Sequence, residues 1–180
     1  MHGGYNVLAN ETLFWDQKAI TDALGRWCRI VDTKSLDHMP LVFADSIEWD
    51  FGKGTVDVGL AKVIERIRAH LIRDSNCGAT QHHLANLRVD LDGDTAESEA
   101  YFFATHAGVG PYSGQVLLQW GNYNDFWHRT VSGWRIVKRI YRIDISQGPL
   151  EIVYGSAPPE MWKEGDERSL QRPSSPRPKS

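Results

Sequence analysis

Hydrophobic residues recur every three or four positions between residues 17 and 32, and this spacing places them on one side of a helix. The stripe consists of Ile20, Leu24, Trp27, Cys28 and Val31. A second helical stripe covers residues 58–73. Between these two, residues 35–44 form a shorter apolar segment in which Pro40 predicts an irregular turn. The first half of the chain therefore predicts three helices, each with one buried face.

Alternating apolar and polar positions predict strands in the rest of the chain. Residues 47–51 alternate in this way, as expected for a half-buried strand. Four longer segments of strand character follow, separated by glycine-containing turns, over residues 80–92, 95–106, 114–130 and 133–146. Helices followed by four consecutive antiparallel strands predict an α+β fold, with the helices packed on one face of a bent sheet.

The length and composition of the chain fit one folded domain. A chain of 180 residues with 41% hydrophobic content can bury a single core, which we assign to residues 17–154. Residues 1–16 are interpreted as an N-terminal extension. Residues 155–180 are rich in proline, serine and charge, so they are predicted to form a flexible tail.

The charge balance and the cysteines exclude several classes of partner. The 20 basic and 23 acidic residues give a net charge of -3, which argues against nucleic acid as a partner. Cys28 and Cys77 lie far apart without a CxxC spacing, so we expect two reduced thiols and no zinc site. The first residues do not resemble a secretion signal and no long apolar run predicts a membrane span, so the expected location is the cytoplasm.

Histidine is the side chain best suited to move protons near neutral pH, and two histidines begin the strand over residues 80–92. Strict alternation would place His83 inside with Leu87, and would place His82 outside with Arg88. A bulge after the histidines would exchange the two. The other histidines have neither an HxH nor an HExxH spacing, so no metal site is expected at His2, His38, His70, His106 or His128.

Two charged residues complete the list of candidates for catalysis. Asp32 lies one turn beyond Cys28 at the end of the first predicted helix, where it either points to the core or is solvated. A carboxylate at this end of a helix meets an unfavourable dipole, which argues for a specific role. Arg139 lies in the last predicted strand, where a surface position and a pocket position are both open.

The order of short motifs resembles the SnoaL-like group of the nuclear-transport-factor-2-like superfamily, from about residue 17 to residue 146. An aspartate ends the first helix, and F-A-D and then E-W follow in the first strand. H-x-x-x-N-L-R, G-D-T-A and G-W-R-I come later in the same order. The resemblance implies a cone-shaped α+β barrel, in which N-terminal helices cap a highly curved sheet that encloses a pocket.

Within this superfamily the motifs are most similar to those of scytalone dehydratase, bile-acid dehydratase and hexachlorocyclohexane dehydrochlorinase. The resemblance puts the family histidine at His82, its aspartate at Asp32 and a pocket arginine at Arg139; His83 is the alternative to His82. It implies a cofactor-independent elimination or double-bond isomerisation, with His82 as general base oriented by Asp32. It also implies a homo-oligomer, with a trimer favoured over a dimer.

The chain also departs from those enzymes. Trp27 stands where the dehydratases have a tyrosine and the dehydrochlorinase a lysine, so the usual leaving-group helper is missing or moved. A wall of aromatic residues suited to a bulky hydrophobic substrate is expected from Trp27, Trp49, Phe51, Tyr101, Phe103 and Tyr123. Two alternatives remain, because related proteins act as polyketide cyclases or as non-catalytic β subunits of aromatic-ring dioxygenases.

Overall fold

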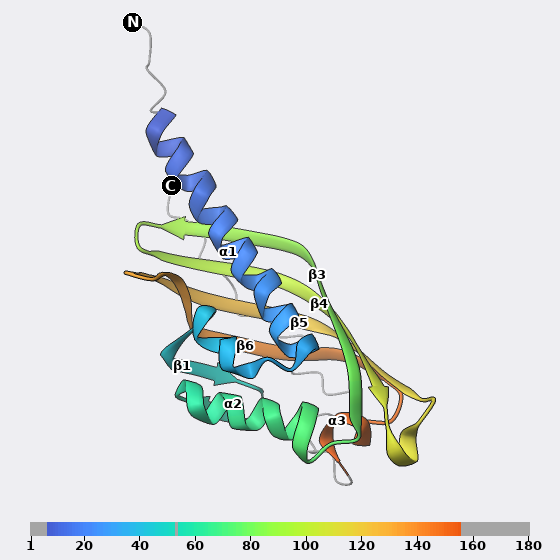
Figure 1. Ribbon diagram of the computed structural model, residues 1–180. Coiled ribbons are helices and arrows are strands. Elements are labelled where there is room, and N and C mark those ends of the chain that lie inside the picture. Colours follow the sequence, from blue (N-terminus) through green and yellow to red (C-terminus); the bar gives the residue numbers. More distant parts are fainter. Residues whose placement is uncertain (1–6, 53, 156–180) are drawn as a thin grey trace, which may run out of the picture.

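The computed structural model describes residues 7–52 and 54–155 (Figure 1). The helical elements are α1 (Val7–Thr33), α2 (Leu60–Arg68), α3 (Glu151–Tyr154), two short 3₁₀ helices (Leu36–Leu41 and Gly110–Tyr112) and a π turn (Ala69–Arg73). The strands are β1 (Phe43–Asp50), β2 (Val56–Val58), β3 (Cys77–Asp92), β4 (Thr95–Gly108), β5 (Val116–Thr130) and β6 (Gly133–Gln147).

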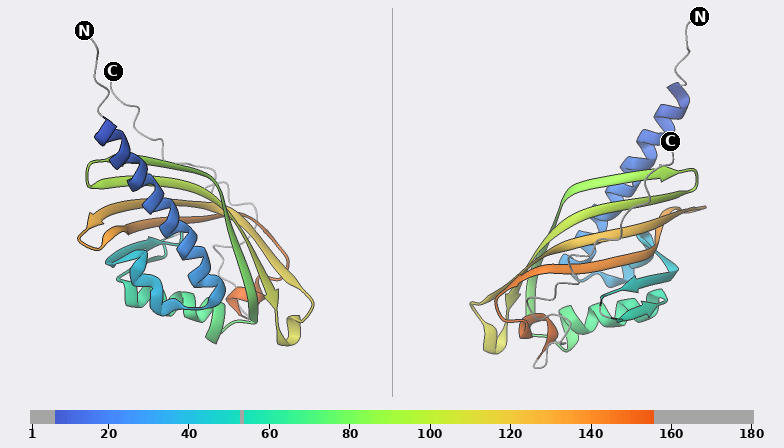
Figure 2. Two further views of the ribbon diagram at one scale, coloured as in Figure 1. Left: turned by 45° about the horizontal axis from the view of Figure 1, so that its top comes forward. Right: turned by 180° about the vertical axis from the view of Figure 1, so that it is seen from behind.

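The six strands form one curved, open sheet in the order β2-β1-β6-β5-β4-β3. The predicted meander of four antiparallel strands is confirmed as β3 to β6. β1 joins β6 in parallel, so the sheet is mixed at that edge. The helix α1 runs across one face of the sheet (Figure 1). The helix α2 lies below β1 and packs against it. Seen from behind, the described helices leave the other face of the long strands uncovered (Figure 2). The α+β fold with helices on one face of a curved sheet is therefore confirmed.

The apolar stripe of α1 packs into the core as predicted, with Ile20, Leu24 and Val31 at most 1% exposed. The helix begins at Val7, ten residues before the start of the predicted helix. Its first turns project beyond the sheet (Figure 1), and Phe14 and Trp15 are more than half exposed. With no core to face there, the sequence has no periodic stripe that would reveal a helix.

Other element boundaries also differ from the prediction. The segment predicted as a helix over residues 35–44 is a 3₁₀ helix that ends at Leu41, and β1 begins at Phe43 rather than at residue 47. Pro40 has no N–H for an α-helical hydrogen bond, which explains the short element. The predicted helix over residues 58–73 begins at Leu60, and β2 occupies Val58 instead. β2 and α3 have only three and four residues, too few for a periodic pattern.

Gly121 shows how the sheet bends at a register shift between β5 and β6. A Cβ atom at this position would lie 2.0 Å from the Arg142 carbonyl oxygen and 2.7 Å from the Phe102 ring. Only glycine permits this close approach of backbone and ring.

Residues 1–6 of the predicted extension and 156–180 of the predicted tail lie outside the described residues. In the described part, no helix has the length and apolar character needed to cross a membrane.

Candidate functional site

A β-bulge decides which of the two adjacent histidines faces the core. The pairing of β3 with β4 shifts register between Ala85 and Arg88, and Asn86 has a positive φ of 53°. This extra residue reverses the alternation along β3, so that His82 lies on the inner face together with Leu87. His83 is exposed and stacks on Phe103 on the outer face.

His82 contacts Asp32 through both its ring and its backbone. Its Nδ1 atom lies 2.7 Å from Asp32 Oδ1, and its backbone N–H donates to Asp32 Oδ2 at 3.0 Å. A third donor, the Thr80 hydroxyl, reaches Asp32 Oδ1 at 2.9 Å. Asp32 therefore points inward from the end of α1 and ties this helix to β3.

The environment of Asp32 favours its charged form. Burial raises the pKa of Asp32, but the hydrogen bonds from His82 and Thr80 outweigh this effect and hold the pKa below its usual value. An ionised carboxylate has no proton to donate, so Nδ1 of His82 must carry the proton that the two groups share. Nε2, on the edge of the ring away from Asp32, is then free to act as a base.

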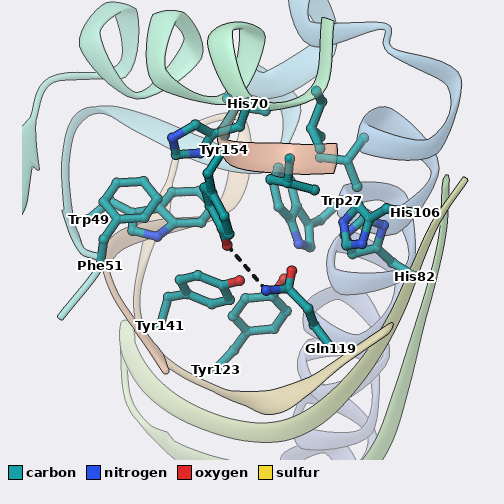
Figure 3. Close-up of a pocket in the computed structure, with 14 residues that line it drawn as sticks. Trp27, Trp49, Phe51, His70, His82, His106, Gln119, Tyr123, Tyr141 and Tyr154 are labelled. Carbon is teal, nitrogen blue, oxygen red and sulfur yellow. Dashed lines mark hydrogen bonds between the residues drawn. The ribbon is translucent and has the colours of Figure 1, made fainter. Parts of the chain in front are cut away.

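A pocket lies between the sheet, α1, α2 and α3, with a cavity volume of about 70 Å³. This is several times the roughly 10–15 Å³ that one water needs on the same measure, so the pocket has room for part of an organic molecule. It is lined by Trp27, Val31, Trp49, Phe51, Ile67, His70, Leu71, His82, His106, Gln119, Tyr123, Tyr141, Val153 and Tyr154. In Figure 3, His82 and His106 lie together on one side, across the pocket from Trp49 and Phe51.

Polar groups gather along a second part of the pocket wall (Figure 3). Gln119, only 2% exposed, donates from Nε2 to the Tyr154 hydroxyl at 3.2 Å. Tyr141 and Tyr123 lie beside this pair, and Tyr141 interacts with Tyr154 through its hydroxyl. Burial raises the pKa of all three tyrosines, so their phenols remain protonated at neutral pH. Because both N–H groups of Gln119 donate within the protein, to Ser146 and Tyr154, a phenol of this wall is the group that can donate a hydrogen bond to an oxygen of a bound molecule.

The pocket contributes little charge to a ligand. None of its lining residues in the described part of the chain is Lys, Arg, Asp or Glu. Burial, followed by the neighbouring His82, lowers the pKa of His106 to about 3. Burial, followed by Arg66, lowers the pKa of His70 to about 4. Both rings are thus neutral at physiological pH.

Arg139 does not line the pocket, although the family resemblance placed it there. It is fully buried behind the aromatic wall, and its Nε and Nη2 atoms each lie 2.7 Å from the carboxylate of Asp125. Its guanidinium lies over four rings, 4.0 Å from the Tyr123 centroid and 5.0–5.1 Å from those of Trp27, Phe43 and Trp49. Arg139 keeps its charge, because the pairing with Asp125 outweighs burial and raises its pKa. It supports the wall from behind.

The six aromatic residues expected in the pocket divide into two groups. Trp27, Trp49, Phe51 and Tyr123 line it. Tyr101 and Phe103 lie on the outer face of β4, because the residue between them, Phe102, points inward and is 3% exposed. Phe103 stacks on Trp120 at 5.0 Å instead of meeting a ligand. Alternation from the buried Phe102 would have excluded both.

Sequence reasoning missed several residues that line the pocket. His106 was set aside for lack of metal-ligand spacing, yet it shares strand parity with Phe102 and so faces inward, with its ring centroid 5.5 Å from that of His82. Gln119 and Tyr141 lie on long strands whose inner positions alternate, so parity pointed to them weakly. His70 and Tyr154 come from short helical elements that carry no such signal. Among residues 7–52 and 54–155, no cluster of three His, Cys, Asp or Glu side chains is arranged to hold a metal ion.

An open curved sheet capped by helices, with a buried His and Asp pair at an aromatic pocket, defines a class of small α+β domains. A family model described as the SnoaL-like domain matches residues 13–140. The chain belongs to the SnoaL-like family.

Similar proteins come from several bacteria. The uncharacterized protein Rv2910c of Mycobacterium tuberculosis is 29% identical over 126 residues, which cover 69% of this chain and 83% of that protein. A putative aromatic ring hydroxylase from Novosphingobium aromaticivorans has 27% identity and a TM-score of 0.68, covering 78% of this chain and 97% of its own. A putative scytalone dehydratase from the same species has a TM-score of 0.70 at 15% identity, covering 78% and 91%, and shows the shared fold.

Proposed function

We propose that this protein is a cofactor-independent lyase or isomerase in which His82 is the general base and Asp32 orients it. The observation that carries the proposal is the 2.7 Å contact between His82 Nδ1 and Asp32 Oδ1 at the wall of an aromatic pocket. Asp32 holds the ring orientation and the tautomer, and it stabilises the imidazolium that forms when Nε2 takes a proton. A positioned base of this kind typically accelerates a reaction by about 10² to 10⁴-fold.

The reaction starts with removal of a proton from a carbon of the substrate by His82. The electron pair left on that carbon forms a double bond as a leaving group departs, or moves along a conjugated system in an isomerisation. Charge that develops on a substrate oxygen would be stabilised by a phenol donor of the wall that contains Tyr141 and Tyr154. His82 then returns its proton to the leaving group, to the substrate or to water.

The proposed substrate is a bulky, hydrophobic and uncharged molecule with an oxygen function. Trp27, Trp49 and Phe51 provide large apolar surfaces, and the stacked rings of Trp49 and Phe51, 5.2 Å apart, form a flat wall. A carboxylate or phosphate on the ligand would meet no cationic side chain among the described lining residues, and it would lie near the negative charge of Asp32. Desolvating such a group without a partner is unfavourable.

Two substitutions test this function, with a third as a matched control. His82→Ala removes the base and Asp32→Asn removes the negative charge; each is expected to lower kcat at least about 100-fold on a hydrophobic substrate that the wild type converts. His83→Ala changes the adjacent, exposed histidine and should leave kcat within about twofold of the wild type. Circular dichroism must show that all three remain folded. Wild-type turnover in the folded His82→Ala and Asp32→Asn variants would refute the proposal.

Two other functions use the same fold. A polyketide-type cyclase would use the same base but form a ring bond, so product analysis by mass spectrometry separates the two: loss of water or acid means elimination, and an unchanged mass with one more ring means cyclisation. The similarity to a putative aromatic ring hydroxylase favours a non-catalytic β subunit as the second candidate. That function requires a larger iron-containing partner, and co-purification of such a chain from the source cell would support it.

We also propose that the chain forms a homo-oligomer, with a trimer favoured over a dimer. The outer sheet face that the described helices leave uncovered carries aromatic and aliphatic residues in one row across β3 to β6: His83, Phe103, Trp120 and Ile145. The rings of His83, Phe103 and Trp120 stack on one another, and Ile145 is 57% exposed. An apolar row of this kind is typical of a surface covered by another subunit.

A further inference from the structure

A chain of hydrogen bonds from Lys34 reaches the same carboxylate oxygen of Asp32 that the His82 ring contacts. Lys34 Nζ donates to Thr80 Oγ1 at 2.8 Å, and Thr80 Oγ1 lies 2.9 Å from Asp32 Oδ1. Asp32 Oδ1 is in turn 2.7 Å from His82 Nδ1. The four side chains come from the end of α1 and the start of β3, and all of them are at least partly buried.

The chemistry of these groups gives the chain a single direction. A lysine ammonium has three donors and no acceptor, so the Thr80 oxygen must accept from Lys34. The Thr80 proton is then left to be donated to Asp32, which can accept but not donate while it is ionised. Reversing the link between Lys34 and Thr80 would place two donors against each other. Because its hydrogen bonds hold the pKa of Asp32 below the usual value, Asp32 is charged and the proton of the His82 pair lies on Nδ1.

The backbone at Lys34 indicates that a lysine here is not required by the fold. Helix α1 ends in a Schellman arrangement, with Lys34 N bonded to Val31 O at 3.4 Å and Ser35 N bonded to Ile30 O at 3.0 Å. Lys34 occupies the left-handed position of this motif with φ 61°, a conformation that glycine adopts most easily. The helix end would thus be satisfied by glycine, which has no side chain to donate to Thr80 as Lys34 does.

We propose that Lys34 and Thr80 are positioning residues that fix the direction of this hydrogen-bond chain and thereby hold Asp32 ionised and aligned with His82. This inference rests on the proposed function of His82 and Asp32 and adds two residues to it. Neither Lys34 nor Thr80 lines the pocket among the described residues, so they act on a substrate only through Asp32.

The effect of Lys34 and Thr80 on the pKa of Asp32 can be measured, because the thiols and the histidine that also face the pair are neutral at pH 7. The groups that face the pair from the elements packed around it are Cys28 on α1, Lys34 after it, Cys77 on β3 and His106 on β4. Burial raises the pKa of both thiols and lowers the pKa of His106 to about 3, so these three groups are neutral at pH 7. Of these four groups, Lys34 is therefore the one that carries a charge at pH 7 and can act on Asp32.

The test follows the carboxyl carbon of Asp32 by ¹³C NMR during a pH titration, with Asp32→Asn to assign the signal. Thr80→Val removes the donor and keeps the branched shape, Lys34→Met removes the cation, and Lys18→Met is the control at an exposed lysine. Thr80→Val and Lys34→Met are expected to raise the Asp32 titration midpoint by about one pH unit, while Lys18→Met leaves it unchanged. Thr80→Ser keeps the hydroxyl and should restore the wild-type midpoint.

Kinetics and stability provide a second, independent readout. Thr80→Val and Lys34→Met should lower kcat by roughly tenfold and leave KM within about twofold of the wild type. They should also move the acid limb of the pH–rate profile to higher pH, because the titration midpoint of Asp32 rises. Lys34→Gly should show the same kinetic loss with a melting temperature at or above that of the wild type, which a merely structural lysine would not produce.

Two results are decisive. An Asp32 midpoint that is the same in wild type, Thr80→Val and Lys34→Met would overturn the role of the chain, whatever the activity. If Thr80→Val does not fold, the Lys34→Met titration decides alone. Full activity in His82→Ala and Asp32→Asn would refute the proposed function instead. The NMR titration would still measure how Lys34 and Thr80 affect the titration midpoint of Asp32.

Discussion

Removing the charge of Asp125 is expected to destabilise the protein strongly, because it leaves Arg139 buried without a counter-ion. Arg139 and Asp125 are at most 1% exposed and share two hydrogen bonds of 2.7 Å. Breaking a buried pair on one side typically costs about 3–5 kcal/mol. The four rings around the guanidinium remain and offset part of this loss, since each cation–π contact is worth about 0.5–2 kcal/mol.

We therefore expect Asp125→Asn to lower the free energy of unfolding by about 3 kcal/mol, the lower end of that range. For a domain of this size, this corresponds to a fall in Tm of about 6–12 °C. The double variant Arg139→Met with Asp125→Leu replaces the ion pair by apolar residues and should recover most of the loss. Urea denaturation of the wild type, Arg139→Met, Asp125→Leu and the double variant provides the complete cycle.

The same cycle tests where Arg139 acts. If Arg139 only supports the aromatic wall from behind, the folded double variant retains activity with a changed KM. A loss of less than about 1 kcal/mol in Asp125→Asn would contradict the reasoning from burial, because an exposed ion pair contributes only that much. A stable but inactive double variant would instead assign Arg139 a direct part in catalysis.

Two further predictions concern acid sensitivity and assembly. His106 and His70 have pKa values of about 3 and about 4 in the fold against 6.5 ordinarily, so the unfolded chain binds more protons as the pH falls. The free energy of unfolding should decrease between pH 6.5 and 4 by up to about 1.4 kcal/mol per pH unit for each histidine. Urea denaturation at several pH values measures this dependence. His106→Gln should make the dependence weaker, whereas the control His128→Gln, at an exposed site, should not change it. Light scattering is expected to show three chains, and Phe103→Glu should yield monomers; a monomeric wild type would contradict the proposed assembly.

The sequence by itself determined the class of fold, and its resemblance to the family named the pair of residues at the candidate site. Period-two alternation is a local property, so the four long strands were predicted with boundaries close to those of β3 to β6. The helical stripe of α1 likewise predicted its buried face. The resemblance of H-x-x-x-N-L-R and of the aspartate at the end of the first helix to the family motifs named His82 and Asp32 as candidates, 50 positions apart in the chain.

Only the tertiary structure decided which side chains face the pocket. Alternation favoured His83, and the bulge at Asn86, which arises from the pairing of β3 with β4, brings His82 inside instead. Arg139 was expected at the pocket but is paired with Asp125 on the neighbouring strand, a contact that depends on strand register. The link from Lys34 through Thr80 to Asp32 joins a helix end to a strand, and no local periodicity encodes a contact between elements that meet only when the chain folds.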